Sequence, residues 1–305
     1  MPQTLHRSLT VWQKLRSNSK TQSDGRNGHA ASSTVLPEET IGGRVGNLEV
    51  RLARTPRELR KAQSLRYKVF YREMAARADT KTRLFRRDED QFDRICDHLV
   101  VLDHDVLTAR KKPKIVGTYR LLRQEIAEKH DGFYTANEFD IAPLIRRHAH
   151  QNFLELGRSC VLPAYRGSRT VELLWHGIWS YVLAHKIDVM FGCASFPGTN
   201  PDDNAIALSF LHHHSIAENN WAVKALPSRR TSMDILPKAE FSARQALKHL
   251  PPLVKGYLRL GAKIGNGAVI DHQFGTTDVL IVLPVAEIDP RYIKHYGAEA
   301  DRFAA

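Results

Sequence analysis

Several signatures of common protein classes are missing from this chain. It has three cysteines among its 305 residues and no C-x-x-C pair, which fits neither a disulfide framework nor a zinc site. The N-terminus lacks the compact apolar core of a signal peptide. No apolar run approaches the ~20 residues of a membrane-spanning helix, and the run Val279–Leu283 stops at Pro284. These absences predict a cytoplasmic protein in a reducing compartment.

Acidic residues are also fewer than basic ones. The chain has 33 Asp and Glu against 45 Lys and Arg, which gives a net charge of +12. Such a balance favours a polyanionic partner, namely nucleic acid, an anionic membrane leaflet or an acidic protein. The sequence contains no recognised nucleic-acid-binding motif and no aromatic-rich basic platform, so we expect no nucleic-acid partner.

Much of the basic character gathers in one C-terminal segment. Residues 241–270 contain no Asp or Glu, and a helix would place Lys255, Arg259 and Lys263 on one stripe because they are spaced four apart. The segment docks an acidic protein, lies on an anionic leaflet or is only a solvated face, and the sequence leaves these three interpretations open. Its basic residues are Arg244, Lys248, Lys255, Arg259 and Lys263.

Composition divides the chain into an extension and one folded domain. Residues 17–33 are rich in Ser, Asn, Gly and Lys and have almost no apolar content. Residues 1–47 are therefore predicted to be a disordered basic N-terminal extension. Residues 48–299 are predicted to fold as one domain, which includes a distinct C-terminal section over 225–299.

Hydrophobic periodicity predicts a mixed α/β fold for this domain. Thr55, Pro56 and Glu58 supply an N-cap, a proline at the first helical position and a capping glutamate, so a helix should begin at Pro56. A second helix is expected over 171–182. Strands are expected at 48–53, 99–102, 114–122, 152–161, 187–196 and 278–285.

Four short blocks occur in an order that resembles the acyl-homoserine-lactone synthases. They are Arg66–Phe70, Asp90–Asp93, Gly117–Leu122 and Glu155–Arg158. Those synthases belong to the GNAT-like acyltransferases, which take acyl chains from acyl carrier protein. The synthases carry a Trp six residues beyond the Phe of the first block, and this chain has Ala76 there.

Four further blocks make the chain similar to the bacterial ornithine Nα-acyltransferases. These blocks are 156–161, 191–199, 209–213 and 250–261, and the similarity covers about residues 48 to 299. The resemblance implies a GNAT-like fold, with a central, mostly antiparallel sheet flanked by helices. It also implies transfer of a 3-hydroxyacyl chain from acyl carrier protein to the α-amine of L-ornithine, the first step of ornithine-lipid synthesis. Acyl carrier protein would deliver the co-substrate, and no cofactor is implied.

Glu155 and Arg158 are the expected catalytic pair. Amide formation from a thioester needs a neutral amine, a group that takes its proton and donors for the oxyanion. Strict strand alternation would place the two side chains on opposite faces, but a β-bulge at Gly157 would bring both toward one cleft. Our hypothesis is that Glu155 accepts the amine proton directly or through water. The alternative is a surface ion pair of Glu155 with an arginine.

Charged residues of the other blocks are expected to bind the amino acid. Arg120 and Arg158 would hold its carboxylate, and Asp90 and Asp93 its side-chain ammonium. Alternatively, these residues form a salt-bridge network that shapes the cap. Phe70 either packs in the core or lines the acyl channel. The expected substrate-binding set is Arg66, Phe70, Asp90, Asp93 and Arg120.

The segment 163–170 lies where GNAT enzymes place their pyrophosphate loop, between a strand and a helix. A helix N-terminus offers free N–H groups to an anion. Bulkier residues replace the later small residues of the CoA pattern, which suits a phosphopantetheine arm better than CoA. The residues expected to contact that arm are Val161, Arg166, Gly167, Ser168 and Arg169.

Two other groups of reactive side chains are expected to be inert. Cys160 and Cys193 are predicted to be core residues, because acyl transfer in GNAT enzymes is direct. Three adjacent histidines, 212–214, cannot all face one ion on a helix, so we expect no metal site.

Two rival functions remain at this point. One is acyl-homoserine-lactone synthesis, and the other is non-catalytic binding to a membrane surface. The predicted location is the cytoplasm, with the cytoplasmic face of the inner membrane as the site of peripheral attachment.

Overall fold

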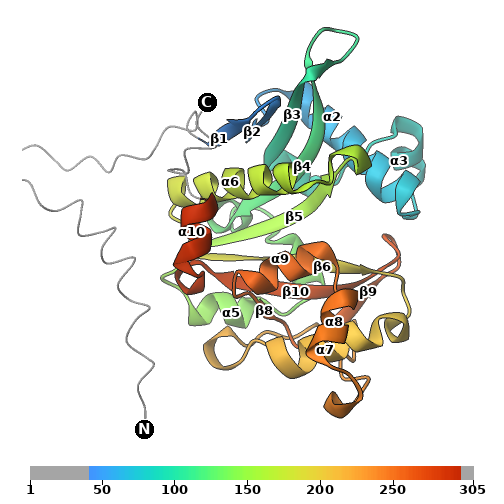
Figure 1. Ribbon diagram of the computed structural model, residues 1–305, viewed down its shortest axis with the longest axis vertical. Helices are drawn as coiled ribbons and strands as arrows, with labels where there is room; N and C mark the ends of the chain where they lie inside the picture. Colours follow the sequence, from blue (N-terminus) through green and yellow to red (C-terminus); the bar gives the residue numbers. More distant parts are fainter. Residues whose placement is uncertain (1–40, 297–305) are drawn as a thin grey trace, which may run out of the picture.

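The computed structural model describes residues 41–296, and their strands form one ten-stranded sheet (Figure 1). All neighbouring strands are antiparallel except β5 and β6. β8 (Lys263–Ile264) pairs with β10 beside the main path. The other strands, in spatial order, are β1 (Gly42–Val45), β2 (Leu48–Leu52), β3 (Asp97–Leu107), β4 (Pro113–Arg123), β5 (Phe153–Val161), β6 (Val189–Pro197), β10 (Thr276–Pro284), β9 (Ala268–Asp271) and β7 (Arg230–Thr231).

Helices cover both faces of the sheet. Figure 1 shows α6 and α9 in front of the strands, and apolar residues of α2 and α5 pack on the opposite face. None of the helices between residues 41 and 296 is long and apolar enough to cross a membrane. The α-helices are α2 (Pro56–Tyr67), α3 (Thr80–Phe85), α4 (Gln124–Ala127), α5 (Ala142–Arg147), α6 (Ser168–Ala184), α7 (Ala205–Ser215), α8 (Ala243–His249), α9 (Pro252–Arg259) and α10 (Pro290–Tyr296).

Short 3-10 and π segments connect these elements. The π-helical turn η2 (Lys68–Glu73) continues α2 directly, and its residues carry Phe70 toward the sheet. The 3-10 segments are η3 (Gln91–Arg94), η4 (Tyr134–Asn137), η5 (Pro163–Tyr165), η6 (Pro201–Asn204), η7 (Asn219–Trp221), η8 (Lys238–Glu240) and η9 (Val285–Glu287).

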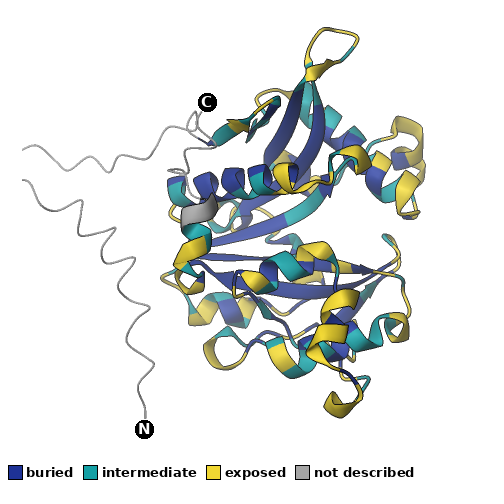
Figure 2. Ribbon diagram, in the orientation of Figure 1, coloured by how far each residue is buried: buried dark blue, intermediate teal, exposed yellow. Residues whose placement is uncertain are grey.

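Because both faces are covered, the central strands are buried on both sides (Figure 2). In β10, Val279 and Ile281 join the layer under α6 and α9, whereas Leu280 and Val282 join the layer on the other face. A strand buried on both sides reads as a continuous apolar run. This burial explains why residues 279–283 of the sequence show no alternation.

The mixed α/β architecture and the mostly antiparallel sheet predicted from the sequence are confirmed. The Thr55 hydroxyl accepts a hydrogen bond of 3.2 Å from the N–H of Glu58, so α2 begins at the predicted cap. The sheet starts earlier than expected, because β1 lies within the predicted extension 1–47. Residues 1–40 of that extension, and 297–299 of the predicted domain, lie outside the described residues.

One expectation for the basic segment is wrong. Its second helix, α9, ends at Arg259, so Lys263 does not continue a stripe with Lys255 and Arg259. Lys263 lies on β8 and forms an ion pair of 2.5 Å with Glu287. Gly261, which has a φ of 96°, follows the helix and takes the left-handed conformation that ends helices.

The parallel pair β5 and β6 separates after three residue pairs. Their pairing runs only from Phe153 with Val189 to Glu155 with Phe191, although each strand has nine residues. At the next position the backbones are in close approach, since a Cβ atom on Gly192 would lie 2.2 Å from the Leu156 carbonyl oxygen. Beyond this point β5 pairs with β4, and no strand within residues 41–296 pairs with its other edge.

This close approach predicts that Gly192→Ala destabilises the fold. The added methyl must push two backbones apart, which we expect to lower the free energy of unfolding by about 1–3 kcal/mol. Gly256→Ala is the matched control, because it lies within α9 and its added Cβ meets no atom within 4 Å. That control should be neutral or stabilising by up to about 1 kcal/mol. Urea unfolding of both variants checks the difference, and equal stabilities would contradict it.

Candidate active site

A β-bulge interrupts β5 where it runs free of β6. The β4–β5 register pairs Arg120 with Gly157 and Thr118 with Cys160, so two residues of β5 lie opposite one residue of β4. Arg158 is one of the two and has a φ of 51°. The bulge that the sequence predicts at Gly157 is therefore present one residue later.

Glu155 lies at the last pair before the strands separate, and it is 5% exposed. One carboxylate oxygen accepts a hydrogen bond of 2.7 Å from the N–H of Thr135, and the other accepts one of 3.1 Å from the N–H of Tyr134. Burial raises the pKa of the carboxyl, and these hydrogen bonds offset only part of that rise. The alternative of a surface ion pair is wrong, because this carboxylate is buried.

Arg158 contacts the same segment as Glu155. Its guanidinium lies 4.7 Å from the Tyr134 ring centroid and 4.6 Å from that of Phe274. One edge reaches two carboxylates, with Nη2 at 3.2 Å from Asp90 and Nε at 3.4 Å from Asp88. The bulge thus brings Glu155 and Arg158 together at Tyr134.

Three arginines and three aspartates form a network behind this site. Arg66 is 1% exposed and binds Asp88 at 2.8 Å and Asp93 at 2.6 Å. Arg120 is 4% exposed and donates to both oxygens of Asp90 at 2.7 Å. Burial alone would raise the pKa of Asp93, but the hydrogen bond and charge of Arg66 outweigh it and hold the pKa at about 2. These contacts are those of the salt-bridge alternative, so Asp90 and Asp93 already hold cations.

Phe70 lies between the apolar cluster under α2 and the aromatic residues of the site. It packs against the apolar cluster under α2, and its ring meets the Phe274 ring edge-on at 5.6 Å. Phe274 in turn stacks on Arg158. The Phe70 side chain therefore connects the hydrophobic core with the aromatic residues of the site.

A second acidic group, which the sequence analysis did not predict, lies near the site. Carboxylate oxygens of Glu138, Asp271 and Asp278 lie within 4.8 Å of one another, and all three residues are buried. They come from the residue after η4, the end of β9 and the middle of β10. One signal was available, because Asp278 is the only charged residue within the apolar strand 276–284.

The predicted phosphopantetheine loop lies between β5 and α6. Gly167 precedes the first residue of α6, and the first intrahelical bond runs from the N–H of Val171 to the Gly167 carbonyl. The N–H groups of the first turn therefore point outward without intrahelical partners. Arg166 pairs with Glu73 at 2.5 Å and binds the Val161 carbonyl at 3.0 Å. The loop residues 166–169 are exposed.

The thiols do not have the character of nucleophiles. Burial raises the pKa of Cys96 to about 12 and also raises the pKa values of Cys160 and Cys193. A thiol that reacts as a nucleophile needs a lowered pKa, because the thiolate is the reactive form.

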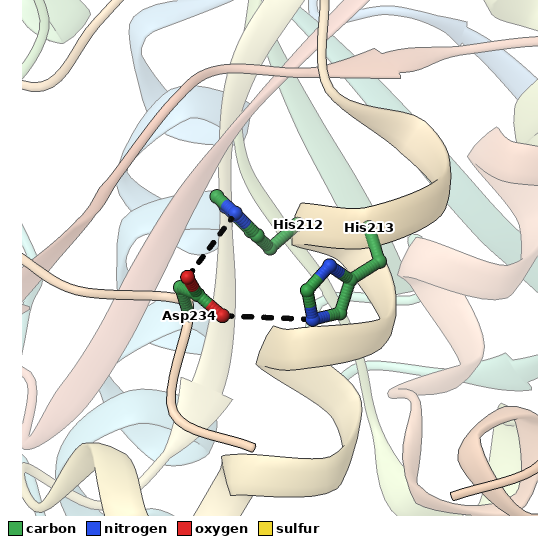
Figure 3. Close-up of side chains that lie close together, drawn as sticks. All are labelled: His212, His213 and Asp234. Atoms are coloured by element: carbon green, nitrogen blue, oxygen red, sulfur yellow. Dashed lines mark ion pairs between the residues drawn. The ribbon is translucent and has the colours of Figure 1, made fainter. Parts of the chain in front are cut away.

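Two of the adjacent histidines meet a carboxylate that the sequence did not reveal (Figure 3). Asp234 lies 3.7 Å from His212 and 3.5 Å from His213. The same nitrogen of His213 lies 3.1 Å from the Leu236 carbonyl oxygen. A carbonyl can only accept, so this nitrogen carries a proton and is occupied as a donor. These contacts describe a hydrogen-bonded group rather than a set of metal ligands.

Comparison with known proteins agrees with this geometry. Residues 65–176 match the family model described as an acetyltransferase (GNAT) domain. The strand separation, the bulge in β5 and the loop before α6 therefore define a GNAT-type acyltransferase. One solved structure, an N-acyl amino acid synthase from uncultured soil microbes, has a TM-score of 0.44 at 11% identity over 78% of this chain and 91% of its own.

Curated relatives share much more sequence identity with this chain than that structure does. The chain is 54% identical over 271 residues to the L-ornithine Nα-acyltransferase of Agrobacterium fabrum, which covers 89% of this chain and 92% of the relative. It is 56% identical over 263 residues to the enzyme of that name from Brucella abortus, covering 86% and 93%. The chain belongs to the L-ornithine Nα-acyltransferase family.

The buried network predicts a large loss of stability in Arg66→Met. Removing this arginine leaves Asp88 and Asp93 buried without their main cation, which should cost about 3–5 kcal/mol. Arg291→Met is the control, because Arg291 is 86% exposed in its pair with Asp289 and its loss should have no measurable effect. Chemical denaturation followed by circular dichroism measures both. A small loss in Arg66→Met would show that the network does not stabilise the domain.

Proposed function

We propose that this protein transfers a 3-hydroxyacyl chain from acyl carrier protein to the α-amine of L-ornithine. The product is lyso-ornithine lipid. Membership of the family supports the reaction class and the acceptor. The observation that carries the mechanism is the position of Glu155, a buried carboxylate of raised pKa at the point where β5 and β6 separate.

Glu155 acts as the general base. The two N–H groups of residues 134 and 135 fix its carboxylate, and its raised pKa brings it closer to neutral pH, where a base is most effective. The neutral α-amine attacks the thioester carbonyl carbon and gives its proton to Glu155, directly or through one water. The tetrahedral intermediate then breaks its C–S bond, and the carrier-protein thiolate takes up the proton.

The free edge of β5 supplies the donors for the oxyanion. Among the described strands none pairs with β5 on the side of β6 beyond Glu155, and we assign the backbone N–H groups of this open edge to the thioester oxygen. A bulge re-aims such groups because it breaks the regular ladder.

Arg158 holds the carboxylate of the amino acid. It is 12% exposed, against 1% for Arg66 and 4% for Arg120, so it is the arginine of the network that a substrate reaches most easily. The rings of Tyr134 and Phe274 fix the plane of its guanidinium, which suits bidentate recognition of a carboxylate.

The donor binds along the loop before α6. The free N–H groups of its first turn bind the phosphodiester of the phosphopantetheine arm. Arg166 and Arg169 are exposed beside this turn, and they offer positive charge to an acidic carrier protein.

A product assay by mass spectrometry tests the reaction. Wild-type protein with 3-hydroxyacyl carrier protein and ornithine should form acyl-ornithine, and Glu155→Gln should lower kcat by about 10²–10⁴-fold because the base is lost. Glu125→Gln is the control, since Glu125 is 61% exposed and its ion pair is with Arg123, outside the proposed site. The acyl-CoA thioester and S-adenosylmethionine serve as the competing donor and acceptor.

Each outcome of this assay separates the rival functions. A lactone formed from S-adenosylmethionine would favour the homoserine-lactone synthases. A protein that binds carrier protein or liposomes but forms no product with any pair would be a binding module. Full activity of Glu155→Gln would show that Glu155 is not the general base, and it would leave the proposed reaction unchanged.

Peripheral attachment to an anionic membrane is the second part of the proposal. The short helices α8 and α9 carry basic residues together with exposed leucines, since Leu247 is 45% and Leu253 is 36% exposed. This combination of apolar and basic groups suits a surface of anionic lipid headgroups. The basic residues are Arg244, Lys248, Lys255 and Arg259.

Vesicle sedimentation tests this attachment. Replacing Arg244, Lys248, Lys255 and Arg259 together by Gln should weaken binding to anionic vesicles at least tenfold, because each charge contributes about 1 kcal/mol near such a surface. The control replaces Arg110, Lys111 and Lys112, which are exposed at the tip between β3 and β4. Equal losses in both variants would indicate a general charge effect. A higher KM for acyl carrier protein with unchanged vesicle binding would assign the surface to the carrier.

A further inference from the structure

The second acidic group, formed by Glu138, Asp271 and Asp278, differs from the aspartates of the arginine network in its charge balance. Asp88, Asp90 and Asp93 face three arginines at ion-pair distance. In the second group, the one ion pair found within residues 41–296 joins Arg229 to Glu138 at 3.9 Å. The second group therefore combines three buried carboxylates with little compensating positive charge.

One carboxylate oxygen in this group lacks a well-formed hydrogen bond within the described residues. Asp278 is 6% exposed, and its Oδ1 atom accepts no hydrogen bond of normal geometry from the part of the chain that the structure describes. The hydroxyls of Ser195 and Thr276 lie near enough to lower its pKa, but burial outweighs them and raises it. A buried carboxylate without a full set of donors costs free energy unless a ligand completes it.

The group lies next to the proposed reaction centre. Cys193 bridges them, since its thiol lies 3.2 Å from Glu138 and 3.7 Å from the hydroxyl of Thr135, whose N–H holds Glu155. On the other side, Asp271 accepts a hydrogen bond of 2.9 Å from the N–H of Phe274, whose ring stacks on Arg158. One residue, Phe274, thus separates the acidic group from Arg158, and two residues, Cys193 and Thr135, separate it from Glu155.

We propose that Glu138, Asp271 and Asp278 bind the side-chain ammonium of the acceptor amino acid and so select a diamino acid. This assignment rests on the proposed function, because it requires an amino acid as acceptor. It replaces the role that the sequence suggested for Asp90 and Asp93, whose carboxylates are occupied by arginines.

The binding mode has three points. Arg158 holds the α-carboxylate, Glu155 receives the proton of the α-amine and the acidic group holds the distal nitrogen. The two nitrogens of extended ornithine are about 6 Å apart, given bonds of about 1.5 Å. An ammonium ion has three donors and no acceptor, so a pocket of carboxylate oxygens complements it fully.

Steady-state kinetics with three acceptors tests the proposal. Ornithine, lysine and norvaline share the α-amino acid group, and norvaline has the carbon chain of ornithine without its distal nitrogen. Wild-type protein should prefer ornithine to norvaline strongly in kcat/KM. In Asp278→Asn that ratio should fall about 10- to 100-fold, as expected for loss of a charge-assisted contact. The KM for the acyl donor should not change.

Two further variants complete the design. Glu138→Gln should lower the ratio in the same way, and it decides the question if Asp278→Asn does not fold by circular dichroism. Asp202→Asn is the control, because Asp202 is an exposed carboxylate on η6. Its ornithine-to-norvaline ratio should equal that of the wild type.

Three results would overturn the proposal. Equal losses for ornithine and norvaline in both cluster variants would show a purely structural role. Calorimetric binding of Mg²⁺, Ca²⁺ or Mn²⁺ that is lost in Asp278→Asn, together with loss of activity after chelation, would identify a metal site. An unchanged ratio in well-folded variants would place the ammonium elsewhere. Failure of the proposed function is distinct, since the wild type would then form no acyl-ornithine.

Discussion

The separation of β5 from β6 is the constraint on which the site depends. Two parallel strands normally continue their ladder, but here the pairing ends at Glu155 and the backbones touch at Gly192. The bulge at Arg158 then turns the free strand so that a charged side chain points to the same segment as Glu155. The carboxylate of Glu155 and the guanidinium of Arg158 reach the same segment within four residues of chain because of one interruption in the sheet.

Buried charge is the cost of building the site in this place, and the arginine network offsets it. A guanidinium that is 1% exposed, such as Arg66, is stable only with close carboxylate partners. Asp88 and Asp93 supply these partners, and Asp90 connects Arg120 with Arg158. The network therefore fixes the position of Arg158 without closing it off from a substrate.

The sequence predicted most of the fold but only part of the site. The cap at Thr55, six of the ten strands and the long helix α6 follow from local patterns, and these patterns hold in the structure. The bulge was predicted because glycine and charge alternation mark it locally. In contrast, Glu155 is held by the backbone N–H groups of residues 134 and 135. Almost any residue type offers such an N–H group, so no sequence motif reveals these two donors.

Long-range contacts explain the remaining errors. Glu138, Asp271 and Asp278 are separated by up to 140 positions, and only the neighbouring strands β9 and β10 bring two of them together. The prediction of a basic stripe was wrong for a local reason, since α9 ends before Gly261 and does not reach Lys263. Sequence periodicity thus failed to predict two kinds of feature. These are contacts between elements that are distant in sequence, and the exact ends of helices.

In the proposed binding mode, the arrangement of charge also distinguishes the two amines of a diamino acid. An acidic group around the distal nitrogen stabilises its ammonium form, and an ammonium has no lone pair with which to attack a thioester. In that mode the α-nitrogen lies between Arg158, whose positive charge disfavours an ammonium form, and Glu155, which takes up its proton. The raised pKa of Glu155 makes it able to accept that proton. The same field that binds the substrate therefore leaves the α-amine as the nucleophile.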